Sequence, residues 1–469
     1  MTHLNLQQVV EHDYCVGCGL CMAQSKKGRM FETVKGTYIP DLAALTKSEI
    51  ESAENFCPFA KASDIEDVVA SKVFKVNNLR YLEGLGYYHK TYAGYAIEGK
   101  FREQGSSAGL VNWLCSKLLR DGYIDTIIHV KEDTSSNNKM YSYQESSDIE
   151  SLQSGAKSKY YPVELSEVVK ALLSQPSKKV AIVGLPCFIK ALRAYEEDNL
   201  QLKEQIKFHI GIVCGHLKSK NYAKFLGWQA GIEPNNLKLI DFRTKLKKSP
   251  ASRYGFTAIP RVGSEDSWII KPMSEVVGGN WGHGVFKLTA CEYCDDIMAE
   301  TSDIVFGDAW LPEFVGDSGG TNIINSRSPF LSNLLQDGDD KGLIKLQELT
   351  PKRVLDSQRS GLRHRREGLS YRSGRDEALG KPFPKKRTKP NSHQLNIVRK
   401  TTYEYRELIR QTSHKSFLLA ADHRDLSISL SMLKPIIESY SKISRVNLIQ
   451  RIIAKAKKVL TKLVQRNSN

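Results

Sequence analysis

Three closely spaced cysteines near the start of the chain predict an iron–sulfur cluster. Cys15, Cys18 and Cys21 stand three residues apart with glycines between them, and a fourth thiol, Cys57, is followed by Pro58. Three thiolates within seven residues and a separate Cys-Pro pair are typical of the ligands of a 4Fe–4S cluster. Zinc is the alternative, although four-cysteine zinc sites usually consist of two separated Cys-x-x-Cys pairs. The spacing therefore favours electron transfer.

The pattern departs from the usual ferredoxin run after its third cysteine. That run continues with a fourth cysteine and a proline, whereas this chain has Ser25 at the cysteine position. Because iron–sulfur clusters are held by soft thiolates, we expect the fourth bond to come from Cys57. The intervening residues 30–55 predict a hairpin and a short helix.

Four further cysteines are predicted to form a second set. Cys187 and Cys214 follow two apolar strands, and ligands of open α/β sheets collect at the carboxyl ends of strands. With the pair Cys291 and Cys294 they make four thiols, enough for a second 4Fe–4S cluster. The alternative is buried unligated cysteines and a redox-active pair. The ninth cysteine, Cys115, falls on the apolar stripe of a predicted helix and is expected in the core.

The elements that must position these thiols alternate between strands and helices. We expect strands at 92–96, 125–130, 180–183, 208–213 and 303–306, and helices at 110–119, 163–173 and 189–195. This alternation predicts an α/β fold. A Gly/Ser-rich loop at 105–109 opens onto a predicted helix, where free N–H groups favour a phosphate; an ordinary helix cap is the alternative.

Composition places the chain among cytoplasmic proteins. No signal peptide and no apolar run long enough to span a membrane is found in the sequence. The odd number of cysteines, nine, and their grouping in motifs argue against a secreted disulfide scaffold. No Gly-x-Gly-x-x-Gly pattern after a strand and no P-loop pattern occurs, so NAD and nucleotide triphosphates lack support. Because clusters carry single electrons, a flavin is the expected converter to two-electron chemistry.

Positive charge is concentrated at the end of the chain. Residues 361–469 hold 25 Lys and Arg against eight Asp and Glu, whereas the first 360 residues hold 43 against 44. Residues 381–390 predict a Pro-rich basic linker, and residues 442–466 place apolar side chains on one helix face without any acidic residue. This pattern predicts a detachable tail for peripheral contact with an anionic membrane or an acidic groove of a partner. A helix packed on the body is the alternative, and nucleic-acid binding is not expected.

Together the motifs resemble the beta subunit of coenzyme F420-reducing hydrogenase and its relatives. These relatives include ferredoxin-dependent 7-hydroxymethyl chlorophyll a reductase and bacterial proteins often found among polysaccharide-biosynthesis genes. The resemblance covers residues 10–372 and adds residues 155–160, 242–245 and 307–310 to the cysteine motifs. It implies an oxidoreductase with FAD and two 4Fe–4S clusters in one chain. Electrons would pass from a ferredoxin-like donor through both clusters to FAD, and on to a small-molecule substrate as hydride.

The resemblance also implies which residues hold the cofactors. The second cysteine set matches the cluster nearest the flavin. Residues that match the flavin-binding stretches or could bond the flavin are Gly105, Ser106, Ser107, Gly109, Ser158, Lys159, Tyr160, Arg243, Lys245 and Asp308. Ala108 stands where the family more often has glycine. Candidate proton donors are Lys245 and His216, with His283 as a further histidine that titrates near neutrality.

We therefore expect three parts. Residues 1–75 form a ferredoxin-like 4Fe–4S module, residues 76–380 an α/β domain for FAD and the second cluster, and residues 381–469 the basic linker and helical tail. The leading hypothesis is a cytoplasmic iron–sulfur flavoprotein oxidoreductase. Two alternatives stay open: a non-catalytic electron-relay subunit of a larger complex, and a zinc-stabilised scaffold in glycan biosynthesis.

Overall fold

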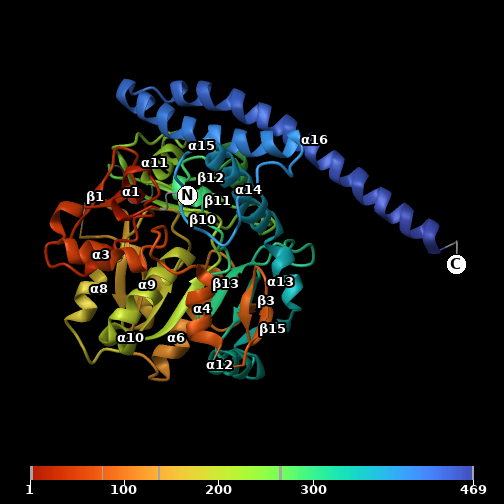
Figure 1. Ribbon diagram of the computed structural model, residues 1–469. Coiled ribbons are helices and arrows are strands. Elements are labelled where there is room, and N and C mark those ends of the chain that lie inside the picture. Colours follow the sequence, from red (N-terminus) through yellow and green to blue (C-terminus); the bar gives the residue numbers. More distant parts are fainter. Residues whose placement is uncertain (1–3, 76–77, 136–137, 263–266, 467–469) are drawn as a thin grey trace.

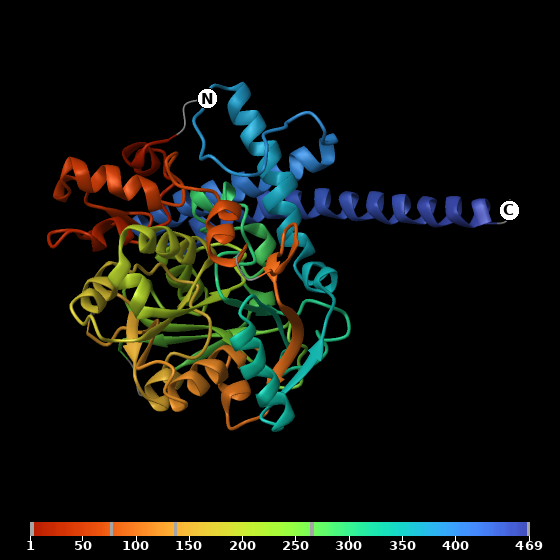
Figure 2. The same cartoon turned by 60° about the horizontal axis from the view of Figure 1, so that its bottom comes forward.

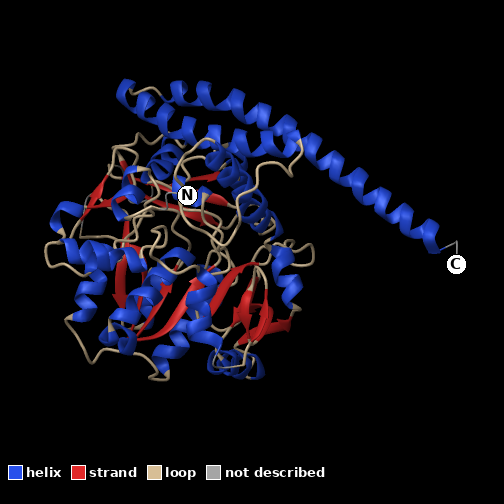
Figure 3. Cartoon of the chain, in the orientation of Figure 1, coloured by secondary structure: helices blue, strands red, loops and turns tan. Residues whose placement is uncertain are grey.

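An eight-stranded mixed sheet forms the centre of the protein in the computed structural model (Figures 1 and 3). The structure describes residues 4–75, 78–135, 138–262 and 267–466, with the main chain alone for 447–466. In sheet order the strands are β15 (Ile344–Glu348), β5 (Lys90–Ala96), β14 (Asn322–Ser326), β13 (Ile304–Asp308), β9 (Ile206–Ile212), β8 (Val180–Gly184), β6 (Thr126–Glu132) and β7 (Tyr141–Ser146). The expected α/β fold is confirmed.

The four central strands, β13, β9, β8 and β6, run parallel, and the outer strands pair antiparallel. Parallel strands are covered on both faces, and these are accordingly apolar runs. In β13, Ile304 and Phe306 pack on one face with Trp113, whereas Val305 packs on the opposite face with Val354. The loops after β8, β9 and β13 therefore leave the same edge of the sheet.

Helices cover this sheet on both faces. They are α5 (Phe101–Gln104), α6 (Leu110–Arg120), α7 (Ile149–Ser154), α8 (Ser166–Leu173), α9 (Pro186–Asp198), α10 (Leu200–Gln205), α12 (Pro329–Asp340) and α13 (Pro351–Ser357). Helix α11 (Lys220–Gln229) packs instead against a smaller antiparallel sheet and the C-terminal region. Helix α6 buries Leu110, Trp113, Leu114, Cys115 and Leu118 on one stripe. Cys115 is fully buried in this core, as expected from its place in the sequence.

The first 75 residues form a small module beside the sheet. Its elements are α1 (Leu6–Glu11), α2 (Leu20–Ala23), β1 (Met30–Glu32), β2 (Tyr38–Pro40), η1 (Leu42–Ala44), α3 (Lys47–Phe56) and α4 (Glu66–Phe74). Thr46 and Glu49 form a capping box that starts α3. The predicted hairpin and helix between Ser25 and Cys57 are therefore present.

Two smaller sheets complete the strand structure. An antiparallel sheet contains β10 (Leu237–Thr244), β11 (Gly255–Pro260) and β12 (Ile269–Pro272), and β3 (Arg80–Leu82) pairs with β4 (Gly86–Tyr88). Single 3-10 turns follow at η3 (Met273–Glu275), η4 (Trp281–His283) and η5 (Thr289–Glu292). Strand β10 ends beside the large sheet and brings Arg243 and Lys245 toward it.

The C-terminal region consists of α14 (Arg359–Ala378), α15 (Ile397–His423) and α16 (Leu426–Arg466). Helices α15 and α16 form a hairpin across the body, and α16 continues past it in both views (Figures 1 and 2). No helix among the described residues is long and apolar enough to cross a membrane. The side chains of the predicted amphipathic face beyond residue 446 lie outside the described residues.

The linker expected at 381–390 differs from the structure, because this segment packs on the body. Lys386 is almost fully buried and donates to the carbonyl oxygen of Pro58 at 3.0 Å. Arg387 pairs with Glu300 and with Asp67. We call residues 381–390 the strap. A basic, Pro-rich segment is usually solvated, but the cations of the strap meet carboxylates that are distant in the sequence.

The beginning of the tail also belongs to the body. Phe417 of α15 packs with Phe286 at 5.6 Å between ring centroids, and Ser413 Oγ accepts a hydrogen bond from the Phe286 N–H at 2.7 Å. Arg410 donates to Thr289 Oγ1 at 2.8 Å. Residues 381–423 are therefore not detachable, which corrects the expectation of a separate tail for that part.

Candidate functional site

The first four cysteines surround one small cavity in the N-terminal module. Cys15, Cys18 and Cys21 approach it from the loop before α2 and from α2 itself, and Cys57 approaches from the end of α3. Burial raises the pKa of all four thiols, that of Cys18 to about 12, and the other thiols raise it further for the first three. Ser25 is not among the residues that line this cavity. The geometry brings together the four residues predicted from the sequence.

Two glycines shape the loop between these cysteines. Gly17 and Gly19 have φ angles of +70° and +79°, a region that side chains other than glycine rarely adopt. A Cβ on Gly19 would lie 2.6 Å from Glu164 Oε2. The Gly17 N–H points at Cys15 Sγ, 3.4 Å away. The glycines thus let the backbone turn its N–H groups toward the sulfurs.

The second set of cysteines meets at the carboxyl edge of the large sheet. Cys187 lies in the first turn of α9, Cys214 follows β9, and Cys291 and Cys294 flank the end of η5. Burial raises the pKa of Cys187 well above its usual value, and the other three thiols raise it further. The Leu217 N–H donates to Cys291 Sγ at 3.2 Å. All four predicted thiols face one another.

The two cysteine sets are neighbours. Besides burial and the members of its own set, Cys18 raises the pKa of Cys187. Tyr143 is close to both: burial, then Cys187 and Cys18, raise the pKa of its hydroxyl. The Leu165 N–H before α8 donates to the carbonyl oxygen of Cys18 at 2.8 Å and fixes the module against the body. An electron carrier held by each set would lie next to the other.

Each set of four thiols could hold either a zinc ion or an iron–sulfur cluster. Across the part of the chain that the structure describes, no three His, Cys, Asp or Glu side chains are grouped to hold a single metal ion. Four sulfurs around zinc would each lie about 2.3 Å from the ion and hence close together. Four soft thiols in each set are also the number and type of ligand that an iron–sulfur cluster takes.

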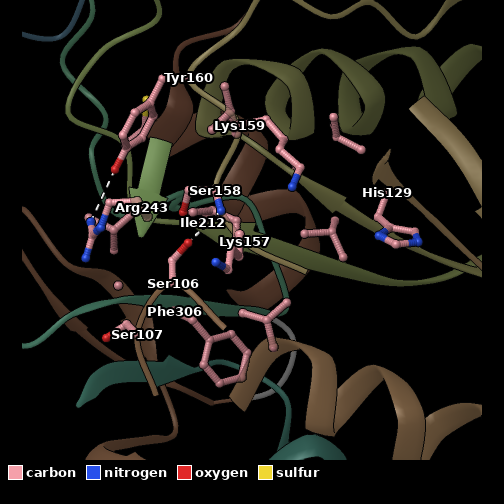
Figure 4. A pocket seen from close by; sticks show the side chains of 18 of the residues that line it. Ser106, Ser107, His129, Lys157, Ser158, Lys159, Tyr160, Ile212, Arg243 and Phe306 are labelled. Atoms are coloured by element: carbon pink, nitrogen blue, oxygen red, sulfur yellow. Dashed lines mark hydrogen bonds between the residues drawn. The ribbon is translucent and has the colours of Figure 1, made fainter. Parts of the chain in front are cut away.

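A cavity of about 280 Å³ opens beside the second cysteine set (Figure 4). Cys214 lines this cavity and also belongs to the second set. Candidate residues that line it are Gly105, Ser106, Ser107, Gly109, Ser158, Lys159, Tyr160, His216, Arg243 and Asp308. The volume is just below the range of about 300–1,000 Å³ that small-molecule and cofactor sites usually have. The structure thus brings most of the candidates into one place.

The Gly/Ser loop at 105–109 leads directly into α6 at the cavity. Gly109, the N-cap, has φ +78°, and a Cβ there would collide with the carbonyl oxygen of Phe101. No side chain caps the helix, so its first N–H groups remain open to an anion. Ser106 Oγ accepts a hydrogen bond from the Ser158 N–H at 2.7 Å (Figure 4). The two predicted stretches therefore form one wall.

Arg243 lies beside this wall (Figure 4). Its guanidinium bonds Asp308 at 2.9 Å and Tyr160 at 3.2 Å, and lies over the ring of Tyr254 at 4.2 Å (Figure 4). The side chain is buried, and its Nε has no hydrogen-bond partner among the described residues. A buried donor without a partner costs free energy, so this N–H is suited to a polar ligand.

His216 lies flat against Trp281 at the inner end of the cavity. The ring centroids are 4.3 Å apart with 17° between the planes. Burial, followed by the charges of Lys218 and Lys287, lowers the pKa of His216 well below its usual value. The imidazole is therefore neutral at physiological pH, and its buried Nε2 has no partner among the described residues.

Lys245 and His283, by contrast, are not among the residues that line the cavity. Lys245 Nζ donates to the carbonyl oxygens of Arg102 and Ser107, the latter at 3.0 Å, and so supports the Gly/Ser loop from behind. His283 lies in η4 with its ring edge-on to Tyr440, 5.6 Å away. Lys245 and His283 are therefore placed to support the structure around the cavity and not to contact a ligand in it.

Several cavity residues had no signal in the sequence. Trp281, Lys218, His129 and Asn322 line the cavity from four separate segments. Lys218 is fully buried and lies over the Trp281 ring at 4.7 Å. None of these four residues belongs to a motif. Lys218 alone could have been noticed in the sequence, because it stands two residues after His216.

Two family models match the chain, and both describe the beta subunit of coenzyme F420 hydrogenase/dehydrogenase. Residues 91–170 match the model of the N-terminal part of that protein. Residues 177–352 match the model of its C-terminal part. Together the matches span more than half of the 469 residues. They include the cavity and the second cysteine set but begin after the N-terminal module.

The chain is also similar to a solved structure described as xenon derivatization of the F420-reducing NiFe hydrogenase complex from Methanosarcina barkeri. The chain is 13% identical to it, with a TM-score of 0.48, and the match covers 65% of this chain and 98% of that one. No curated protein sequence matches the chain.

Proposed function

We propose that this chain, which belongs to the coenzyme F420 hydrogenase/dehydrogenase beta subunit family, is an electron-transfer oxidoreductase that holds two 4Fe–4S clusters and FAD. The family supports an oxidoreductase in general. The observation that carries the finer proposal is the position of Cys214. This thiol belongs to the second cysteine set and also lines the large cavity. A group in the cavity and a group on the thiols would therefore be adjacent.

The residues present fit these groups. Cys15, Cys18, Cys21 and Cys57 would hold the first cluster, and Cys187, Cys214, Cys291 and Cys294 the second. The open N-terminus of α6 suits a phosphate of FAD, and the unpartnered Nε of Arg243 suits a polar atom of its ring or ribityl chain. When bound, the clusters carry single electrons and FAD converts them to the two-electron transfer of a hydride.

The chain's own residues would exclude water from the cavity and supply the proton that reduction of a substrate requires. Trp281 lines the cavity with His216 stacked on it and Tyr160 tilted against it. Lys159 Nζ lies in the cavity wall, and burial lowers its pKa to about 8 although Asp241 opposes the change. An ammonium with this pKa can release a proton near neutrality, which a general acid requires. We assign this role to Lys159 rather than to Lys245 or the neutral His216.

The order of the centres implies a direction. The first set lies in the outer module, the second set between module and cavity, and the cavity in the body. A one-electron donor of the ferredoxin class would deliver to the first set, and a small-molecule substrate would meet FAD in the cavity. A chain that only relays electrons would accept them equally well but would reduce no substrate by itself.

Metal and flavin analysis of the anaerobically purified protein tests this proposal. We expect about eight iron atoms and eight sulfides per chain, because two sets of four thiols are present. Cys187→Ser should lose about four iron atoms while the FAD content stays unchanged. Cys115→Ser is the matched control, because Cys115 is a buried thiol outside both sets and should change neither content.

Two results would contradict the proposal. One is a colourless zinc protein without flavin, which would favour a scaffold. The other is wild-type protein with about four iron atoms that Cys187→Ser leaves unchanged, which would remove the second cluster.

A further inference from the structure

Arg365, in α14, is a buried guanidinium with an unusual set of partners. It is 2% exposed and lies against the second cysteine set. Its N–H groups donate to three backbone carbonyl oxygens, those of Cys291, Cys294 and Gly215, the second at 3.3 Å. Each carbonyl belongs to a cysteine of the second set or to the residue that follows one. Arg365 therefore joins the two segments that supply three of the four thiols.

The charge of Arg365 has no carboxylate partner. Among the described residues, no Asp or Glu oxygen lies within ion-pair distance of its guanidinium. Glu292 is nearby, but it pairs with Lys287 and with Arg372 at 3.3 Å. Carbonyl oxygens solvate a cation but do not neutralise it, and a buried uncompensated charge is destabilising.

The groups that can compensate this charge are the thiols. Burial lowers the pKa of Arg365, but Cys294, Cys291 and Cys214, followed by Glu292, together raise it more, so the net change is upward. Protonated thiols carry no charge, whereas thiolates bound to iron do. Because Glu292 already pairs with Lys287 and Arg372, the charge of Arg365 is best balanced when the second set carries its inorganic group.

The first cysteine set has a different electrostatic environment. Two lysines, Lys190 and Lys386, act on Cys57, and Lys386 also acts on Cys294 of the second set. Both share the buried carboxylate of Glu66, at 3.5 Å each. Their charge is partly balanced before any cluster is bound.

We infer that Arg365 is a positioning residue that sets the reduction potential of the second cluster above that of the first. This inference rests on the proposed function. A fixed positive charge beside one cluster favours the reduced form of that cluster, because reduction adds negative charge there. Electrons arriving at the first cluster then move toward the cavity. Arg365 gives the relay its direction without touching the reacting atoms.

Arg372 offers a matched control on the same helix. It stands two turns after Arg365, is 1% exposed, and likewise donates to a backbone carbonyl, that of Glu292, at 2.6 and 3.1 Å. Unlike Arg365, it pairs with a carboxylate, that of Glu292. Its replacement removes a buried arginine of α14 whose guanidinium, unlike that of Arg365, faces a carboxylate.

The test is a redox titration of the full-length anaerobic protein, followed by electron paramagnetic resonance. Cys187→Ser, which keeps the first cluster alone, identifies the signal of each cluster. Arg365→Gln should lower the midpoint potential of the second cluster by at least about 59 mV, a tenfold change in its reduction equilibrium. The first cluster should keep its potential, and Arg372→Gln should move neither.

Arg365→Lys separates charge from geometry. The ammonium introduced in this variant keeps the charge but loses the planar fork that bonds three carbonyl oxygens. Because the charge is kept, the midpoint potential of the second cluster should stay within about 59 mV of the wild-type value. This variant decides the question if Arg365→Gln fails to retain iron. A larger shift in Arg365→Lys would show that geometry, not charge, sets the potential, and would overturn the inference.

Failure of the inference is distinguishable from failure of the proposed function. Wild-type protein with both clusters, in which Arg365→Gln shifts neither potential or shifts both equally, refutes the role of Arg365 alone. Wild-type protein with one cluster refutes the proposed function, and the inference with it.

Discussion

Gly109 is the residue on which the shape of the cavity wall depends most directly. Its φ of +78° and the carbonyl oxygen of Phe101 exclude any side chain at this position. We expect Gly109→Ala to lose FAD, because the loop must move away from the α6 N-terminus, while the iron content stays unchanged. Flavin released on denaturation and iron analysis measure the two effects.

Gly122, beyond the other end of α6, is the control for Gly109. It also has a positive φ, +72°, but a Cβ there meets nothing within 4 Å. Gly122→Ala should cost about 1 kcal/mol of stability and leave FAD bound. If both variants keep FAD, or if both lose it, the loop is not the flavin contact.

Residue type and spacing allowed the sequence to predict the thiols but not their surroundings. Ligation chemistry requires cysteine itself, so Cys57 could be preferred over Ser25 from chemistry alone. Arg365 and Trp281 lie at the site because distant segments meet there, and no local pattern marks them. Lys245 had the right residue type, but its ammonium supports the loop from outside the cavity.

At the scale of elements, a buried cluster of ionisable side chains connects two neighbouring strands of the large sheet and a helix that covers it. The imidazole Nε2 of His209 in β9 bonds Glu196 of α9 at 2.5 Å. The backbone N–H of His209 donates to the carboxylate of Asp303, just before β13, at 2.7 Å. Burial and Arg193 lower the pKa of His209, but Glu196 and Asp303 raise it more, and the net change is upward. This group helps fix the strand that leads to Cys214.

The raised pKa makes the stability of the protein depend on pH. A histidine whose pKa is raised by folding stabilises the fold below its usual pKa of about 6.5 and ceases to do so as pH rises through the folded value. We expect the wild-type unfolding free energy to fall more steeply above about pH 6.5 than that of His209→Gln. Denaturant unfolding at several pH values measures this, and parallel curves for the two proteins would refute it.

The strands and helices were predictable because apolar runs and helical periodicity are local properties. The strand predicted at 180–183 is Val180–Gly184, and the one at 303–306 is Ile304–Asp308. The strap was not predictable. Lys386 and Arg387 belong to a basic, Pro-rich segment that is usually solvated, and their buried partners Glu66 and Glu300 lie far away in the sequence.

At the scale of the whole molecule, the C-terminal region encloses the N-terminal module. The Tyr14 hydroxyl donates to the carbonyl oxygen of Pro382 at 3.1 Å, and Lys386 reaches Pro58, next to Cys57. Helix α15 buries Ile409 and Phe417 in the same core. The first cysteine set therefore depends on residues from both ends of the chain.

Two truncations distinguish the packed part of this region from the rest. A chain that ends at residue 446 should keep both clusters and FAD, because the contacts of the strap and of α15 remain. A chain that ends at Pro390 should aggregate or lose iron, since it exposes the apolar surface that Phe417 and Ile409 cover. Iron content and size-exclusion behaviour are the measurements. Full iron content in the shorter chain would show that α15 is dispensable.

Because the strap is synthesised late, the N-terminal cysteines stay uncovered for a time during translation. Lys386 and Pro58 are 328 residues apart. At the usual rate of translation, roughly 15 to 65 seconds separate their synthesis on the ribosome. During that interval the nascent N-terminal thiols lack their final cover and are open to oxidation and to capture by zinc. Under the proposed function, delivery of iron and sulfide to the first four cysteines has to outpace these reactions or follow the closing of the strap.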